Sequence, residues 1–569
     1  MCSICGGHYP RAVVESASAA MAHRGPDNRG IFVHDNCVLA HNRLRIIDLS
    51  DDANQPFSSP FAPHLVLVYN GEIFNYRELR AELVREDVPL STTSDTEVLF
   101  CAFAHWGERC LQRLNGDFAF AVFDTKSGEL FLARDRLGNK PLYYTLEQGR
   151  LFFASEIKAF FALRSWRFDL LQVASWLAFG GGDCDKTIYE GIMPFPPASF
   201  ARFAPGDDAL HPVRYWDFAP QSPTITRLDS ALDELQELLL DSVRLRMLSD
   251  VPVALSVSGG IDSSLIAHCV RILDAPCKLF GVSFVGFVGS DESAHIAELA
   301  RDIDRPITQI TPNLEHFAQD FPRLVHAQDE IFRSFSIYAQ FLLFEALSHH
   351  CVVALGGQGA DELFGGYYHH IARFVFAHKQ ALHDRVLLYG KTALDELRFG
   401  AQCALSRQAK TRLFADDNAY AFSRLESLGL PRPPLDYLLE RFIPDFEQSL
   451  WNDVCIFSLP HLLRYEDRNA MWFGVENRCP FTDYRLVEFA FKLDSNLKCA
   501  EGFSKYLLRK LLERLGSPNL AWRTDKIGFG APESALLQIL GYNYNTIFDV
   551  RLCIFDALQK RNEETHAMD

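Results

Sequence analysis

The residue at position 2 can act as a nucleophile. The chain opens with residues 1–7, MCSICGG, so removal of Met1 would make Cys2 the amino terminus. Cys2 would then carry a thiol and a free α-amine on the same carbon. Because an α-amine has a pKa near about 7.7–8.0, it can take the thiol proton close to neutral pH. This is the arrangement of an N-terminal nucleophile, a thiol activated by a neighbouring base.

Polar segments in the next hundred residues suit the binding of a free amino acid. They are 23–27 (HRGPD), 40–44 (AHNRL), 69–75 (YNGEIFN) and 94–97 (SDTE). Arg43 or Arg45 fits an α-carboxylate, because a planar guanidinium can bond both carboxylate oxygens. Asp95 fits an α-ammonium. The sequence alone leaves the choice between the two arginines open.

Asn70 and Gly71 follow an apolar, β-rich run, Leu65 to Tyr69. The Asn70 side-chain amide and the Gly71 N–H can form an oxyanion hole, in which one donor lowers a reaction barrier by roughly 2.7–4 kcal/mol. The same Asn-Gly dipeptide is also the strongest short signal for a β-hairpin turn. Both interpretations remain open at this point.

The second half contains a candidate phosphate loop. We predict a strand from Val251 to Val257, a turn at 258–264 (SGGIDSS) and a helix from Ser264 to Leu273. Glycines let backbone N–H groups approach a phosphate, and the positive end of the helix dipole favours an anion. Because Gly-Lys-Ser/Thr is missing, the segment is not a Walker loop. The pattern is typical of a pyrophosphate cradle.

A second glycine-rich loop carries two carboxylates. A predicted strand, Val352 to Leu355, runs into residues 356–367, GGQGADELFGGY. Asp361 and Glu362, together with Asp262, can hold Mg²⁺ on a pyrophosphate, because this ion prefers carboxylate and phosphate oxygens. The alternative is that Asp361 and Glu362 only cap a helix.

Length and composition indicate at least two globular domains. The chain has 569 residues, which is too long for a single ordinary hydrophobic core. Its hydrophobic fraction of 48% is that of a globular protein. A stretch rich in Pro, Asp and Ser near residues 204–226 is typical of a linker. We therefore predict domains at 1–205 and 227–569, joined by a linker at 206–226. The second domain begins with an amphipathic helix, Leu228 to Met247.

Charge and cysteine content exclude several classes of function. The net charge of −17 argues against nucleic-acid binding, which needs many phosphate-neutralising cations. No apolar run is long enough to span a membrane, and the first residues lack the charged-then-apolar pattern of a signal peptide, so we expect a cytoplasmic protein. The 14 cysteines are scattered along the sequence. This distribution is typical of free thiols in a cytoplasmic protein and not of a disulfide framework. Cys2 and Cys5 have no second pair with which to bind a metal.

The first half resembles the glutaminase domain of class II, N-terminal-nucleophile amidotransferases. The match continues through 116–121 (GDFAFA), 134–138 (RDRLG), 140–144 (KPLYY) and 154–159 (ASEIKA). The resemblance implies an αββα sandwich in which Cys2 attacks the carboxamide of glutamine and releases ammonia and glutamate. It places the oxyanion donors at Asn70 and Gly71. The positions that it implies for glutamine binding are Arg43, Leu44, Arg45, Ile46, Ile47, Asn70, Gly71, Glu72 and Asp95. Asn139 stands where that family has a bulky apolar residue, which we interpret as tolerated loop variation.

The second half is similar to the synthetase domain of glutamine-hydrolysing asparagine synthetases. The matching blocks are the two glycine-rich loops, 463–471 (LRYEDRNAM), 476–483 (ENRCPFTD), Lys505 and 526–532 (KIGFGAP). The resemblance implies a doubly wound parallel sheet of the ATP-pyrophosphatase type with added helices. It implies ATP and Mg²⁺, with no nucleic acid or membrane partner, and it is compatible with a homodimer.

In the reaction that this resemblance implies, the side-chain carboxylate of L-aspartate attacks ATP to give β-aspartyl-AMP and pyrophosphate. Ammonia from the Cys2 site then reaches the adenylate through a dry internal passage, giving asparagine and AMP. Lys505 would stabilise the transferring charge, unless it lies on a solvated helix face. Asp262 and Asp361 would hold Mg²⁺. The implied ATP-binding positions are Ser256, Ser258, Gly259, Gly260, Asp262, Ser263, Val282, Gly356 and Gly357.

Gln358 departs from the family pattern. Asparagine synthetases carry a glutamate there that is tied to adenylate formation, and a glutamine is neither a base nor a carboxylate ligand. Adenylation needs no base, because a carboxylate nucleophile is already ionised at neutral pH. We therefore expect an active enzyme with aspartate as the acceptor. The alternatives are another acid, such as a sugar acid, a peptide or a secondary metabolite, and a non-catalytic relative.

Overall fold

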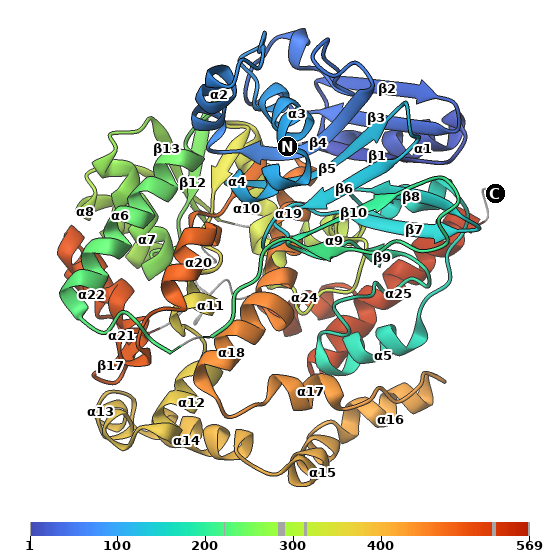
Figure 1. Ribbon diagram of the computed structural model, residues 1–569. Coiled ribbons are helices and arrows are strands. Elements are labelled where there is room, and N and C mark those ends of the chain that lie inside the picture. The colour runs from blue at the N-terminus through green and yellow to red at the C-terminus, as the bar shows by residue number, and fades with distance from the viewer. Residues whose placement is uncertain (1, 221, 283–290, 312–315, 526–530, 567–569) are drawn as a thin grey trace.

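The chain folds into two bodies of different architecture. The computed structural model describes residues 2–220, 222–282, 291–311, 316–525 and 531–566. Antiparallel sheets form the first body, at the top of Figure 1, and a parallel sheet with many helices forms the second. Strand β11 (Val213–Arg214) still pairs with the first body, and helix α6 (Leu228–Arg246) opens the second. The domain boundaries at 205 and 226 stay predictions.

Two antiparallel sheets face each other in the first body. One has the order β2-β3-β1-β8-β7-β9 and the other β11-β10-β6-β5-β4. The strands are β1 (Ser3–Gly7), β2 (Asn28–His34), β3 (Cys37–Arg43), β4 (Leu65–Ile73), β5 (Gly116–Asp124), β6 (Leu130–Arg134), β7 (Tyr143–Glu147), β8 (Arg150–Ala154), β9 (Met193–Pro194) and β10 (Ser199–Phe203).

An apolar layer lies between these sheets, and helices cover their outer faces. Ile4, Leu39, Val68 and Phe153 belong to the layer, as expected where alternate strand residues point inward. Helix α1 (Arg11–Ala20) packs on β1 and β3, while α3 (Asp95–Trp106) packs on β4 and α2 (Tyr76–Arg85) on α3. The predicted αββα sandwich is confirmed.

The second body contains a five-stranded parallel sheet with the order β14-β13-β12-β15-β16. Its strands are β12 (Val253–Ser256), β13 (Cys277–Val282), β14 (Ile307–Ile310), β15 (Val353–Leu355) and β16 (Glu476–Arg478). Successive strand residues face opposite sides: Leu255 packs in the core with α6, and Ala254 packs in the core with α10 (Ser336–Ser348). Helices thus cover both faces, and the predicted doubly wound sheet is confirmed.

The strand order of this sheet reverses between β12 and β15. Ligands of open parallel sheets bind at such a switch point, beyond the carboxyl ends of the strands. Helix α7 (Ile261–Ile272) follows β12, and α11 (Ala360–Phe364) follows β15. The two glycine-rich loops of the sequence are the connections β12–α7 and β15–α11, so the fold brings them together.

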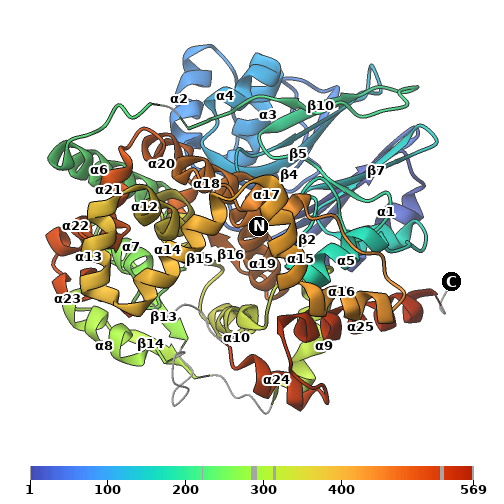
Figure 2. The same cartoon turned by 90° about the horizontal axis from the view of Figure 1, so that it is seen from below.

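Helices α12 (Tyr368–Ala377), α14 (Lys391–Cys403), α15 (Arg407–Asp417) and α16 (Ala419–Ser427) form the layer that faces the viewer in Figure 2. The C-terminal helix α25 (Ile547–His566) packs on α5 (Leu170–Phe179) of the first body. Arg551 Nη1 donates to the carbonyl oxygens of Leu177 and Ala178 at 3.2 and 3.3 Å. The end of the chain therefore ties the two bodies together.

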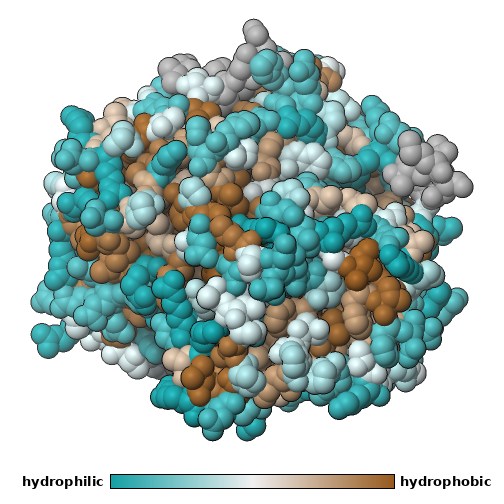
Figure 3. Space-filling model, turned by 90° about the horizontal axis from the view of Figure 1, so that it is seen from above, coloured by the Kyte–Doolittle hydropathy of each residue, from teal (hydrophilic) through white to brown (hydrophobic). Residues whose placement is uncertain are grey.

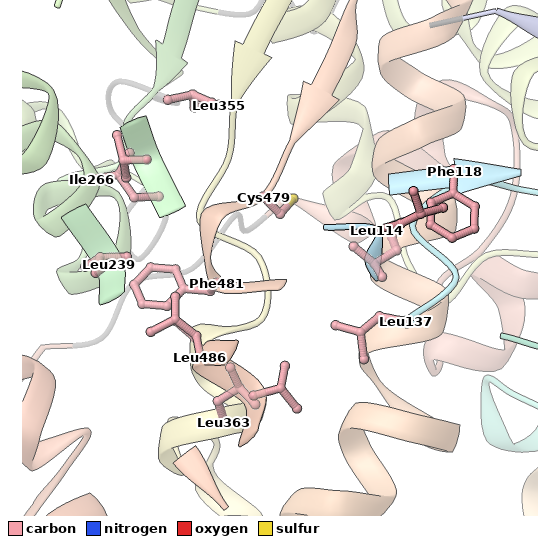
Figure 4. Packing of buried hydrophobic residues seen from close by; sticks show 14 of the residues in the cluster. Leu114, Phe118, Leu137, Leu239, Ile266, Leu355, Leu363, Cys479, Phe481 and Leu486 are labelled. Atoms are coloured by element: carbon pink, nitrogen blue, oxygen red, sulfur yellow. The ribbon is translucent and has the colours of Figure 1, made fainter. Parts of the chain in front are cut away.

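One apolar core crosses the boundary between the bodies. Leu114, Phe118 and Leu137 of the first body belong to the same cluster as Cys479 and Phe481 of the second (Figure 4). Because protein interiors are close-packed, a displacement of one body would be felt by the other through this shared core.

The face seen from above is mostly hydrophilic, with hydrophobic residues in scattered groups (Figure 3). Within the described ranges, no helix has the length and apolar character that crossing a membrane requires.

Candidate active sites

Cys2 is buried beside Asn70 at the start of β1. Its backbone nitrogen donates to Asn70 Oδ1 at 3.0 Å, and its carbonyl oxygen accepts from Arg24 Nε at 3.1 Å. Its Sγ lies 4.0 Å from the carbonyl oxygen of Leu44. The nitrogen that removal of Met1 would turn into the α-amine is therefore fixed next to the thiol.

Burial raises the pKa of the Cys2 thiol above its ordinary value. The thiol accordingly stays protonated near neutral pH and needs a base before it can attack. The α-amine of a processed chain would supply that base on the same residue.

Asn70 and Gly71 lie inside β4, where they pair with Ala119 and Phe118 of β5. The hairpin-turn interpretation of this dipeptide is therefore wrong: pairing with β5 outweighs the local turn preference. Gly71 has a φ of +151°, and a Cβ there would lie 2.1 Å from the Asp117 carbonyl oxygen. Only glycine fits this position.

The Asn70 amide presents an uncommitted donor. Its Oδ1 accepts from the Cys2 nitrogen, while its buried Nδ2 finds no hydrogen-bond partner within the described part of the chain. A buried donor without a partner is costly and rare in native proteins. An oxyanion developing beside Cys2 would give this donor a partner.

Arg43 is the better placed of the two candidate arginines. Its guanidinium is buried and donates to Ser50 O at 2.6 Å, to Asn54 Oδ1 at 2.7 Å and to Asp48 O. Arg45 instead points to the more exposed edge, where it bonds Leu49 O and pairs with Asp51. Three acceptors hold the Arg43 plane in place, as bidentate binding of a carboxylate requires.

Asp95 is buried at the first turn of α3. Its Oδ2 accepts from Tyr69 Oη at 2.9 Å and from the Ile73 N–H at 3.1 Å. Burial raises the pKa of Asp95, and burial together with the charges of Asp95 and Glu476 raises that of Glu72 further. A cationic group arriving here would relieve both penalties.

The other predicted glutamine positions lie close by along the chain. Leu44, Ile46 and Ile47 are buried in the segment after β3, and the Ile46 carbonyl oxygen accepts from the Asp250 N–H of the second body. Glu72 Oε1 lies 3.5 Å from Arg478 Nη2 on β16. The first site is therefore built against the second body.

A cavity of about 550 Å³ opens at the switch point of the parallel sheet. Of the predicted ATP and adenylate positions, it is lined by Ser256, Ser258, Gly260, Asp262, Ser263, Gly356, Gly357 and Gln358. Gly259 contributes through its conformation: its φ is +68°, and a Cβ there would lie 2.6 Å from His295 Cβ. Val282 ends β13, and its side chain lies outside the described residues, as do residues 526–530.

Hydroxyl groups hold the loop between β12 and α7 in shape. The Ser258 N–H donates to Ser263 Oγ at 3.1 Å, and the Gly260 N–H donates to Ser258 Oγ at 3.3 Å. Helix α7 begins at Ile261 and not at Ser264, because Gly260 is extended and serves as its N-cap. The first turn of α7 therefore faces the cavity, where its dipole favours an anion.

Lys505 binds both predicted magnesium ligands. Its Nζ lies 2.7 Å from both oxygens of Asp262 and 2.7 Å from Asp361 Oδ1. Lys505 is buried, with a φ of +54°, directly before α22 (Tyr506–Leu515). Burial lowers its pKa, but the charges of Asp262 and Asp361 outweigh burial and raise it. The alternative of a solvated helix face is therefore wrong.

Asp262 and Asp361 carry the carboxylate oxygens that Mg²⁺ prefers, so the two residues would hold this ion beside the Lys505 ammonium that they both contact. Glu362 does not share this position, because its Oε1 accepts from Tyr367 Oη at 2.5 Å and from Ser458 Oγ at 2.9 Å. The N-cap of α11 is Gly359, and Asp361 and Glu362 lie in the first turn of this helix. The contact of Asp361 with Lys505 goes beyond helix capping, whereas the helix-cap alternative stays open for Glu362.

Several lining residues were missed by sequence reasoning. The cavity also contains Arg385, Arg509 and Arg523, together with Gln340 and Glu466. Arg523 Nη1 donates to the Gly259 carbonyl oxygen at 3.2 Å, which sets a cation at the phosphate loop. Glu466 lies in the matching block 463–471 (LRYEDRNAM), so the sequence identified its motif but not its place in this cavity.

A buried charge network joins the two centres. Arg24, which bonds the Cys2 carbonyl, donates from Nη1 to Glu156 at 2.7 Å and to Asp467 at 2.7 Å, and from Nη2 to Asp467 at 3.0 Å. Arg468 lies 2.8 Å from Glu156. Asp467 and Arg468 belong to helix α19 (Leu459–Trp472) of the second body. Sequence reasoning did not foresee this network.

These centres define a two-site protein, with an N-terminal thiol site in an αββα sandwich and a phosphate site at the switch point of a parallel sheet. Each half of the chain matches a known protein family. Residues 1–216 match the glutamine amidotransferase domain, and residues 234–548 match asparagine synthase. The chain belongs to the asparagine synthase family.

Curated relatives match nearly the whole chain. Asparagine synthetase [glutamine-hydrolyzing] 1 of Bacillus subtilis is 30% identical over 547 residues, covering 91% of this chain and 84% of the relative. Asparagine synthetase [glutamine-hydrolyzing] 3 of the same organism is 28% identical, covering 90% and 83%. Amidase chry2 of Gibberella zeae is 29% identical, covering 88% and 82%.

Proposed function

We propose that this protein is a glutamine-dependent ligase that uses ATP to convert a carboxylic acid into its amide. The observation that carries the proposal is the position of Lys505, held by Asp262 and Asp361 at the phosphate loop. A cation at this position stabilises the negative charge that develops on pyrophosphate as it leaves a nucleoside triphosphate.

The first half supplies ammonia. The α-amine of processed Cys2 takes the thiol proton, and the thiolate adds to the carboxamide carbon of glutamine. Asn70 Nδ2 and the Gly71 N–H donate to the oxyanion. The amine then returns its proton to the departing nitrogen, and ammonia leaves. Water hydrolyses the thioester to glutamate and frees Cys2.

The second half activates the acid. The acid carboxylate attacks the α-phosphorus of ATP, and the bond to the β-phosphate breaks to release pyrophosphate. Asp262 and Asp361 would hold Mg²⁺, which neutralises phosphate charge when bound. Lys505 and Arg523 add positive charge from the chain itself. Ammonia then displaces AMP from the acyl-adenylate.

L-aspartate is our first candidate for the acid, which makes β-aspartyl-AMP the intermediate and asparagine the product. The B. subtilis relatives, which this chain matches over 84% and 83% of their length, are named asparagine synthetases. The second candidate is another carboxylic acid. Gln358 lines the cavity where the family has glutamate, and the similarity to amidase chry2 favours this candidate.

A panel assay tests the proposal. Purified protein would receive ATP, Mg²⁺ and glutamine with L-aspartate, sugar acids, peptides or aromatic acids, and pyrophosphate, glutamate and the amide would be measured. We expect acid-dependent pyrophosphate release and the matching amide by mass spectrometry. The intact mass of the protein, measured by the same method, should show that Met1 is absent. Glutamate release without any acid-dependent pyrophosphate release across the panel would refute the ligase function.

A further inference from the structure

Glu466 of α19 lies where the two halves of the molecule meet. It lines the large cavity beside Gly356 and Gln358, and it also lines a second cavity of about 10 Å³. The other residues of this small cavity are Asn139, Leu463, Asp467, Asn477 and Cys479. Its volume is about that needed for one water, and hence for one ammonia molecule.

The small cavity borders the first body. Asn139 belongs to the loop between β6 and β7, and Asp467 binds the Arg24 that also bonds the Cys2 carbonyl. Glu466 is the only residue among those described that lines both cavities. Asn139, interpreted from sequence as tolerated loop variation, has a polar side chain at this junction. Its Nδ2 donates to Asp117 Oδ1 at 3.0 Å.

The Glu466 carboxyl is fixed by neutral groups. Its Oε1 accepts from Gln340 Nε2 at 3.1 Å, and its Oε2 lies 3.4 Å from Cys479 Sγ. A Cβ on Gly356 would lie 2.8 Å from Oε1, so the carboxyl touches the start of the second glycine-rich loop. No ion pair to Glu466 occurs within the described ranges. Burial raises its pKa to about 8.

Amide formation from ammonia needs a proton acceptor. When the ammonia nitrogen bonds the acyl carbon, the resulting tetrahedral species carries an –NH₃⁺ group. One proton must leave this nitrogen as the bond to the AMP oxygen breaks. Bulk water is the ordinary acceptor, but a passage that keeps ammonia from escaping also keeps water away.

We propose that Glu466 is the catalytic base of amide transfer, taking the proton that the ammonia nitrogen loses as it displaces AMP. This step rests on the proposed ligase function and adds a residue to it. Ammonia and the acyl-adenylate become the amide and AMP, and the Glu466 carboxylate becomes the carboxylic acid. Burial brings the pKa of this carboxyl closer to neutrality than that of an exposed glutamate, and a general base is most effective when its pKa lies near the pH at which it acts.

The test compares Glu466→Gln with wild type in three assays: glutamate release from glutamine, acid-dependent exchange of labelled pyrophosphate into ATP, and amide formation. The acid is L-aspartate or, if aspartate fails, the panel acid that supports pyrophosphate release by wild type. We expect amide formation to fall about a hundredfold or more, the usual contribution of a general base. Glutamate release and pyrophosphate exchange should stay unchanged, which also shows that both halves are folded.

Glu533→Gln is the matched control. Burial raises the pKa of Glu533 to about 7, but it bonds the Phe335 N–H and lines neither cavity. This variant should form amide at the wild-type rate.

Three results would overturn the proposal. Wild-type amide formation by Glu466→Gln would show that no base is needed at this position. Parallel loss of pyrophosphate exchange, or a raised KM for the acid with unchanged kcat, would place Glu466 in acid binding or adenylation. Failure of wild type with every acid would remove the ligase reaction itself, a result distinct from any defect of the variant alone.

Discussion

Replacing Arg24 tests whether the two centres depend on one buried cation. Arg24 is fully buried and bonds Glu156, both oxygens of Asp467 and the Cys2 carbonyl. Arg24→Met keeps most of the apolar stem and removes the guanidinium. Glu156 retains Lys158 and Arg468 as partners, whereas Asp467 loses the group that holds both of its oxygens.

The expected cost follows from the geometry. Two unit charges at 4 Å attract by about 4 kcal/mol at an effective dielectric of 20, and these contacts are shorter. Removing one partner of a buried pair costs about 3–5 kcal/mol, because the other charge stays buried and uncompensated. We therefore expect the free energy of unfolding to fall by about this amount, well beyond the roughly 0.5 kcal/mol of a surface substitution.

Urea unfolding would measure the loss, and glutamate release would report on Cys2, whose carbonyl loses its donor. Asp467→Asn in the Arg24→Met background removes the stranded charge, so the double variant should recover stability. The coupling between the two residues should reach about 0.5–3 kcal/mol, as for residues within one charge network. A single variant with wild-type stability and full glutaminase activity would refute this account of the interface.

Four further predictions follow from the two sites. Cys2→Ala should abolish glutamine hydrolysis but keep synthesis from added ammonia, because the nucleophile and the ATP loop lie in separate bodies; residual glutamate release would remove Cys2 from the mechanism. Asp262→Ala should abolish pyrophosphate release and spare glutamine hydrolysis, because it removes a carboxylate that holds Lys505; unchanged release would mean that the loop does not bind ATP. Gln358→Glu should preserve or raise aspartate-dependent pyrophosphate release if aspartate is the acceptor, whereas strong wild-type release abolished in the variant would contradict the view that Gln358 merely replaces a glutamate. Burial raises the pKa of Glu466 from 4.5 to about 8, so between these values the folded protein keeps a proton that the unfolded chain releases, and stability falls as pH rises. Glu466→Gln should therefore lose less unfolding free energy than wild type between about pH 5 and about pH 8 in urea titrations; an equal loss would contradict it.

The sequence predicted correctly those features that depend on residues close together in the chain. The loop after β12 and the loop after β15 were recognised because glycines, hydroxyls and carboxylates occur together within a few residues. The helix α6 followed from its apolar spacing, and the structure begins it at Leu228 as predicted. In these segments the local pattern and the rest of the fold favour the same structure.

Predictions from local pattern failed where a contact with a residue distant in the sequence determines the structure. Asn70-Gly71 carries a turn signal, yet β5 pairs with the whole of β4 and keeps the dipeptide extended. The sequence left a solvated helix face open for Lys505, but carboxylates from the first turns of α7 and α11 hold this side chain directly before α22 begins. Arg24 and Asp467 are 443 residues apart, so neither residue type nor spacing could predict their contact.

Helix α19 links the two centres through consecutive residues. Because an α-helix has 3.6 residues per turn, Glu466 and Asp467 point in directions about 100° apart. Glu466 contacts the loop that begins at Gly356, and Asp467 contacts Arg24 and through it Cys2. A displacement of α19 would therefore change the surroundings of both centres at once. The variants separate the two roles: Arg24→Met should disturb glutamine hydrolysis through Cys2, whereas Glu466→Gln should leave hydrolysis intact and stop only the transfer of ammonia. If both variants gave the same defect, α19 would act as a scaffold alone, and the proton-accepting role of Glu466 would be excluded.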